Sequence, residues 1–230
     1  MSEPVDKSQL RDAATILLVR QAPAGPQVLM GMRGAAAAFM PSKYVFPGGA
    51  VDPGDAVVPL ATPLAQGCSA RLSQHARPGL AGALAAAAVR ELWEETGLML
   101  GVPGRWPGAA PPDWQGFAEA GMLPDAGALT FVFRAITPPG RPRRFDARFF
   151  LADAARVAGD VTDFSRACDE LSHLHWVALA EARRLNLPFI TEVVLAEVAA
   201  LLARGEGLAA RTETVPFFDN SNEVSRFIRL

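Results

Sequence analysis

The spacing of apolar residues predicts strands and helices in mixed order along the chain. Short runs rich in β-branched and aromatic residues predict strands, at residues 13–20, 27–33, 128–136, 144–151 and 173–179, with shorter ones ending near residues 47 and 217. Apolar positions at helical spacing predict a long helix over residues 189–203. Shorter helices are predicted near residues 63–75 and 113–122. This order indicates an α+β fold in which helices cover a sheet.

An alanine-rich run over residues 81–89 predicts a further helix, which leads into a cluster of carboxylates. Glu91, Glu94 and Glu95 follow the i, i+3, i+4 spacing, so one helical face carries all three. Like charges so close repel, and a divalent cation such as Mg²⁺, which prefers oxygen ligands, would compensate them. Arg90 precedes Glu94 by four residues and is predicted to pair with it. A solvated acidic helix face is the alternative interpretation.

A glycine-rich turn precedes this helix in the chain. The apolar residues Tyr44, Val45 and Phe46 end in Pro47-Gly48-Gly49, which predicts a strand that stops at a tight turn. Glycine lets the backbone approach a ligand closely, so this turn can present a carbonyl oxygen to the same cation.

Together the two segments resemble the box of the Nudix hydrolases. The second half of the box matches at every fixed position, namely Arg90, Glu91, Leu92, Glu94, Glu95, Gly97 and Leu98. The first half differs, because Gly49 is followed after five residues by Asp55 in place of the family's glutamate. An insertion at about residues 56–82 then splits the box. Such an insertion would form either a lid or pocket wall at the site, or a surface excursion.

The resemblance implies the Nudix fold, a mixed β-sheet sandwiched between α-helices, and dependence on Mg²⁺ or Mn²⁺. The metal ligands it implies are the carboxylates of Glu91, Glu94 and Glu95 and the carbonyl oxygen of Gly48. The residues it implies as structural support are Arg90, Gly49 and Asp55.

The resemblance also implies a general base, and two carboxylates are candidates for it. Glu91 matches the box glutamate that either ligates the metal through water or helps to deprotonate the nucleophile. Glu170 lies six residues before Trp176, a spacing similar to that of a further glutamate on a late loop in many Nudix enzymes. An ordinary loop acid is the alternative interpretation of Glu170.

The implied substrate is a nucleoside diphosphate joined to another moiety. A peroxisomal branch of the family that hydrolyses coenzyme A (CoA) and acyl-CoA also has a split box. Phe39-Met40-Pro41 followed by residues 46–49 resembles its segment before the box. A second CoA signature is absent, because Ala38 and Ser42 occupy its Arg and Gly positions.

Two arginines, Arg144 and Arg148, are predicted to hold an anionic group of the substrate, with a solvated basic edge as the alternative. Two other functions stay open beside CoA hydrolysis. One is a pyrophosphatase of the ADP-ribose or NADH type. The other is a Nudix-like regulatory module that binds a ligand without turnover.

Length and charge restrict these functions further. The 230 residues are predicted to form a single domain, 1–230, and the net charge of −2 gives no footprint for nucleic-acid binding. The isolated Cys68 and Cys168 indicate reduced thiols, with a disulfide between them as the alternative. Met1–Arg11 lacks an apolar signal core, and no stretch has membrane-spanning length. A cytoplasmic location is therefore expected, and the resemblance leaves a homodimer open.

Overall fold

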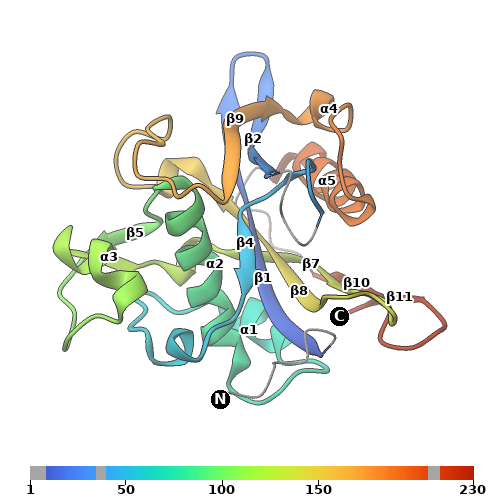
Figure 1. Cartoon of the computed structure of the whole chain (residues 1–230), viewed down its shortest axis with the longest axis horizontal. Helices are drawn as coiled ribbons and strands as arrows, with labels where there is room; N and C mark the ends of the chain where they lie inside the picture. Colours follow the sequence, from blue (N-terminus) through green and yellow to red (C-terminus); the bar gives the residue numbers. More distant parts are fainter. Residues whose placement is uncertain (1–8, 35–39, 207–212) are drawn as a thin grey trace.

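The central strand of the sheet is β1 (Leu10–Ala22), which pairs on both of its edges. In the computed structural model, which describes residues 9–34, 40–206 and 213–230, β8 (Arg144–Asp153) pairs with it in parallel. On the other edge, β4 (Gly48–Ala50) pairs with its first half and β2 (Gly25–Arg33) with its second half, both antiparallel. The β4 strand therefore lies beside β1 where β2 has diverged from it (Figure 1).

The other strands extend this sheet in both directions. The order is β11-β10-β7-β8-β1-β2-β3, and β4 and β9 join off this path to give nine strands among the described residues. The added strands are β3 (Tyr44–Val45), β7 (Thr130–Ile136), β9 (Leu171–Ala178), β10 (Pro216–Asp219) and β11 (Arg226–Arg229). The strand predicted to end near residue 217 is β10, which ends at Asp219, and β11 was not predicted. Phe39, part of the predicted segment before the box, lies outside the described residues.

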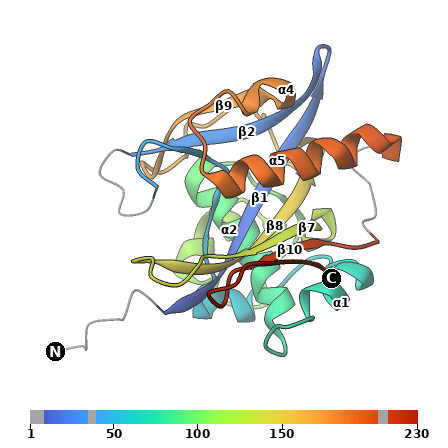
Figure 2. The ribbon, with the colours of Figure 1, turned by 90° about the vertical axis from the view of Figure 1, so that its right-hand side faces the viewer.

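Helices cover the two faces of the sheet, and each face has its own apolar core. Ile16 and Leu18 of β1 pack on the side of α2 (Leu80–Thr96), in one buried cluster. Leu17 and Val19 alternate with them and belong to a second cluster, together with α5 (Phe189–Leu201). Figure 2 shows α2 and α5 on opposite sides of the strands. The predicted α+β class, a mixed sheet between helices, is confirmed.

The alanine-rich run forms most of α2, because small side chains let the helix lie close to the sheet. The helix ends at Gly97, which adopts a left-handed φ of 76° and donates its N–H to the carbonyl of Trp93 at 2.8 Å. A Cβ there would also lie 2.9 Å from Cβ of Arg166 in a later loop. Glycine therefore ends α2 and lets that loop approach the carboxylate end of the helix.

The insertion contributes buried residues to the core on the α2 side of the sheet. After the 3-10 turn η1 (Pro53–Val57), it forms α1 (Gln66–Leu72), within the range predicted for a helix. Cys68 and Leu72 of α1 are buried in the same cluster as α2. Cys68 and the exposed Cys168 are both free thiols, as predicted. The insertion is therefore packed against the sheet and is not a bare surface excursion.

Residues 101–128 contain more structure than the predicted loop and helix. The β5 strand (Gly101–Pro103) pairs with β6 (Met122–Pro124), and between them lie η2 (Pro112–Trp114) and α3 (Gln115–Glu119). Trp114 and Phe117 are buried, and Phe117 packs edge-on against Trp93 of α2 at 5.8 Å between ring centroids. This aromatic packing fixes the segment against α2.

The remaining elements are short turns and helices. They are η3 (Ala126–Ala128), η4 (Ala154–Arg156), α4 (Leu179–Ala182) and a π-helical turn (Leu202–Glu206). Within the described part of the chain, no helix combines the length and the apolarity needed to cross a membrane.

Candidate active site

Arg90 is the centre of the candidate site, and its partners come from both halves of the split box. Its side chain is only 4% exposed. It donates from Nε to Asp55 Oδ1 at 2.9 Å and from Nη2 to Asp55 Oδ2 at 3.0 Å, and Nη2 also donates to the carbonyl oxygen of Ala50 at 2.9 Å. Asp55 and Arg90 therefore form a bidentate ion pair, although the insertion places 34 residues between them in the chain.

The same guanidinium also holds two of the box carboxylates. Arg90 Nη1 donates to Glu91 Oε1 and to Glu94 Oε2, each at 2.9 Å. The predicted pair between Arg90 and Glu94 is therefore present, and Glu91 shares it. Because the guanidinium is planar and its donors point in fixed directions, these bonds orient both carboxylates relative to Asp55.

The glycine turn approaches the carboxylates from the β4 side. Gly48 donates its N–H to Glu95 Oε2 at 2.8 Å. A Cβ at Gly49 would overlap the carboxylate of Glu91, closer than real Cβ atoms ever come. Glycine at position 49 is therefore required for Glu91 to occupy its observed place.

Burial and mutual repulsion perturb the acidity of all three box glutamates. Burial, with the charge of Glu94, raises the pKa of Glu91 to about 7, although the Arg90 guanidinium opposes this shift. Burial also raises the pKa of Glu94, against the same guanidinium. The pKa of Glu95 is raised well above its ordinary value by burial and then by the charge of Glu91, and the Gly48 hydrogen bond only partly offsets this. The Arg90 guanidinium therefore does not offset the burial and mutual repulsion of the three carboxylates, and each of them resists ionising.

This chemistry fits a divalent cation. Glu95 Oε1 is buried and has no hydrogen-bond partner among the described residues, so one carboxylate oxygen is left for a cation. The three carboxylates do not yet converge, because the described residues contain no group of three His, Cys, Asp or Glu side chains placed to hold a metal. Arg90 bonds one oxygen of each of the other two carboxylates, Oε1 of Glu91 and Oε2 of Glu94.

Glu170 lies on the loop that docks against the end of α2. Cys168, two residues before it, donates its N–H to the carbonyl oxygen of Glu94 at 2.9 Å. The Glu170 side chain is half exposed and accepts a hydrogen bond from Arg33 Nη2 at 2.5 Å. The fold thus brings this predicted residue to the box helix, together with Arg33, which no motif had singled out.

The two predicted substrate arginines have different surroundings. Arg148 is 1% exposed, and its Nη1 donates to Asp12 Oδ1 at 2.6 Å while its Nη2 lies 3.1 Å from Asp146 Oδ2. Arg144 keeps a partly exposed side chain and donates from Nε to the carbonyl oxygen of Thr137 at 3.2 Å. Arg148 is therefore committed to an internal ion-pair network, contrary to its predicted role as an anion contact.

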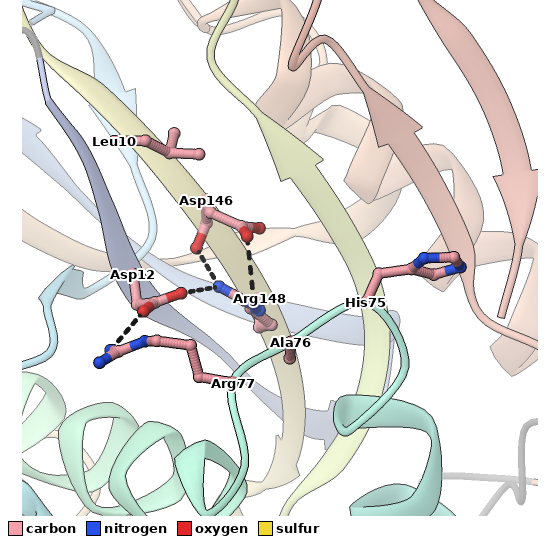
Figure 3. Close-up of a pocket in the computed structure, with 7 residues that line it drawn as sticks. All are labelled: Leu10, Asp12, His75, Ala76, Arg77, Asp146 and Arg148. Atoms are coloured by element: carbon pink, nitrogen blue, oxygen red, sulfur yellow. Dashed lines mark hydrogen bonds and ion pairs between the residues drawn. The ribbon is translucent and has the colours of Figure 1, made fainter.

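Figure 3 shows this network in an open pocket of about 470 Å³ between β1, β8 and the loop before α2. Arg77 from that loop donates to Asp12 Oδ2 at 2.7 Å. Arg134, on neighbouring β7, binds Asp146 and donates to the carbonyl oxygens of Gln74 and His75 at 3.0 Å each. These bonds fasten the end of the insertion to the sheet. A pattern of alternating arginine and aspartate on β8, Arg144-Phe145-Asp146-Ala147-Arg148, was the available sequence signal for it.

Comparison with known proteins finds similarity to Nudix hydrolases. No protein-family model matches the chain. It is 30% identical over 182 residues to "Putative nudix hydrolase 7" of Caenorhabditis elegans, covering 74% of this chain and 52% of that protein, so the chain spans about half the relative's length. It is also similar to the crystal structure of a NUDIX hydrolase from Alicyclobacillus acidocaldarius, with a TM-score of 0.61 and 28% identity over 87% of this chain and 98% of the other.

Proposed function

We propose that this chain, a member of the Nudix hydrolase superfamily by its fold and its box, is a metal-dependent hydrolase of a diphosphate linkage. The substrate class is a nucleoside diphosphate joined to another moiety. One observation carries the proposal: Glu91, Glu94 and Glu95 share one end of α2, and Glu95 keeps a buried oxygen with no partner in the described structure. A cluster with no chemical role would gain stability by losing these charges.

The carboxylates Glu91, Glu94 and Glu95 and the carbonyl oxygen of Gly48 would hold Mg²⁺ or Mn²⁺. A bound cation supplies Lewis acidity toward the phosphoryl oxygens and lowers the pKa of water. The burial of Glu95 behind the glycine turn excludes water from one side of this position.

Two carboxylates are candidates for the base that takes a proton from the attacking water. The pKa of Glu91, raised to about 7 mainly by burial, lies where a general base is efficient near neutral pH. Glu170 is more exposed and already bonded to Arg33. We therefore assign the proton transfer to Glu91 first, with Glu170 as the second candidate.

CoA and acyl-CoA are the substrates we propose to test first. Their support is the resemblance of the split box, and of the segment that ends in Phe46-Pro47-Gly48-Gly49, to the CoA-hydrolysing branch. With Arg148 paired internally, Arg144 is the arginine left to meet an anionic group. ADP-ribose and NADH are the alternatives. A cytoplasmic location and a homodimer also stay predictions.

The test is a mass-spectrometric product assay with Mg²⁺ or Mn²⁺, in which CoA, an acyl-CoA, ADP-ribose and NADH are offered separately. We expect cleavage of a diphosphate bond by the wild-type protein and a loss of at least about a hundredfold in Glu95→Gln, because that change removes a buried metal ligand. Glu181→Gln is the matched control, since Glu181 is exposed and its ion pair within the described part of the chain is with the exposed Arg184.

The products distinguish the candidate functions. Release of 3′,5′-ADP and phosphopantetheine from CoA substrates alone would support the CoA assignment. AMP from ADP-ribose or NADH would replace it while keeping the hydrolase. Ligand-dependent thermal stabilisation with no product from any substrate would support a binding module instead.

A further inference from the structure

Arg33 is a charged residue at the candidate site that the box does not contain. It is the last residue of β2, and its backbone pairs with Leu171, the neighbour of Glu170. Its Nη2 donates to Glu170 Oε1 at 2.5 Å. Its Nε is buried and finds no acceptor among the described residues. Arg33 therefore has one short hydrogen bond, to Glu170, and a buried Nε–H that donates to no group in the described structure.

The pair of Arg33 and Glu170 faces the box carboxylates. After burial and the charge of Glu91, the charge of Glu170 also raises the pKa of Glu95, and the charge of Arg33 lowers it. The loop that carries Glu170 is fixed to α2 by the hydrogen bond from Cys168 N–H to the carbonyl oxygen of Glu94. Through Glu170 and this loop, Arg33 is thus a second guanidinium near the carboxylate end of α2.

The charges around the cluster are unequal even with both arginines counted. Two guanidinium groups, those of Arg33 and Arg90, are surrounded by six carboxylates, which are Asp52, Asp55, Glu91, Glu94, Glu95 and Glu170. A divalent cation would add positive charge where Arg33 already supplies some. The cation and the guanidinium would repel each other, and both attract Glu170.

We infer that Arg33 is a tethered counter-ion that competes with the divalent cation for the carboxylate cluster and holds Glu170 until the cation binds. The inference rests on the metal dependence in the proposed function. It makes Arg33 a positioning residue, which acts through Glu170 and through the charge of the cluster.

The test measures metal binding and not turnover. Mn²⁺ is titrated into the metal-free full-length protein, and free Mn²⁺ is followed by electron paramagnetic resonance. We expect Arg33→Gln to bind Mn²⁺ more tightly by roughly three- to tenfold, the effect of removing one unit charge near a divalent ion at a partly exposed site. Arg33→Lys keeps the charge, so its Mn²⁺ affinity should stay within about twofold of wild type. Arg184→Gln, which removes an exposed arginine paired with Glu181, should leave the affinity unchanged.

Three outcomes overturn the inference. Unchanged or weaker Mn²⁺ binding by Arg33→Gln would show that Arg33 does not compete with the cation. Equal tightening in Arg33→Gln and Arg33→Lys would assign the effect to packing instead of charge. Wild-type protein that binds no Mn²⁺ would overturn the proposed function as well, whereas the first two outcomes leave it standing as long as Glu95→Gln weakens binding.

Discussion

The ion pair between Asp55 and Arg90 gives the sharpest test of how the split box is held together. Replacing Asp55 with Asn keeps the shape but removes the charge, and it turns amide N–H donors toward the donors of a guanidinium that is 4% exposed. Removing one partner of a buried pair costs about 3–5 kcal/mol. Arg90 keeps Glu91 and Glu94 as partners, so we expect the lower end, about 3 kcal/mol. For a chain of this size that lowers Tm by roughly 6–12 °C.

Equilibrium unfolding in urea, in EDTA, measures this loss, with Asp52→Asn as the matched control. Asp52 lies three residues earlier and also approaches Arg90, but at 3.8 Å and with 48% of its side chain exposed, against 1% for Asp55. Exposed pairs of this kind contribute about 0–1 kcal/mol. Equal losses of unfolding free energy in the two variants would refute the assignment of Asp55 as the buried partner of Arg90.

Three further predictions test the cluster, the glycine turn and the insertion. Burial raises the pKa of Glu91 to about 7 from an ordinary 4.5, so the folded state binds the Glu91 proton more tightly than the unfolded state does. The stability that this proton contributes is complete below pH 4.5 and is lost as pH rises through 7. In EDTA, wild type should therefore lose about 3 kcal/mol relative to Glu91→Gln between pH 4.5 and 8, and parallel pH profiles in urea unfolding would contradict this. Gly49→Ala should lower the free energy of unfolding by about 1–3 kcal/mol and product formation by at least tenfold, because the new Cβ displaces Glu91. Its control is Gly82→Ala on α2, where a Cβ meets open space, so that variant should be as stable as wild type or more stable by up to about 1 kcal/mol. Leu72→Ala in α1 should cost about 2–5 kcal/mol by urea unfolding, and a loss under about 1 kcal/mol would place the insertion outside the core.

The parts of the fold that sequence predicted are those in which burial and periodicity agree. The α5 helix and the strands β1, β2, β7, β8 and β9 were predicted from their apolar, β-branched and aromatic residues, and each is found within a few residues of its expected place. The β5–β6 pair was missed because only three residues of each strand pair, and prolines and glycines dominate the segment. Its stability comes from buried Trp114 and Phe117 against α2, a contact between distant residues that no local pattern contains.

The candidate site was predictable where the chemistry is local to one helix turn. The placement of Glu91, Glu94 and Glu95 on one face follows from helical spacing alone. Alternation along β8 places Arg148 and Asp146 on one face of the strand, but their third partner, Asp12, was not predictable, because it becomes a neighbour only through the parallel pairing of β1 with β8. Arg33 was missed for a similar reason, since its charge matters only once β2 and β9 bring it to Glu170.

The insertion adds little to the entropic cost of bringing Asp55 and Arg90 together. Lengthening the connection between the acid and the arginine from the family's usual seven residues to 34 adds only about 1.4 kcal/mol of closure entropy, because that cost grows with the logarithm of length. Leu64 and Leu72 of the insertion are both buried in the α2 core, and burying one such side chain contributes about 1.5–3 kcal/mol. These apolar contacts are larger than the added closure cost, so the length of the connection does not prevent the Asp55–Arg90 pair from forming. The box therefore requires that Asp55 and Arg90 be close in the folded structure, and an insertion that packs through its own apolar residues leaves this contact intact.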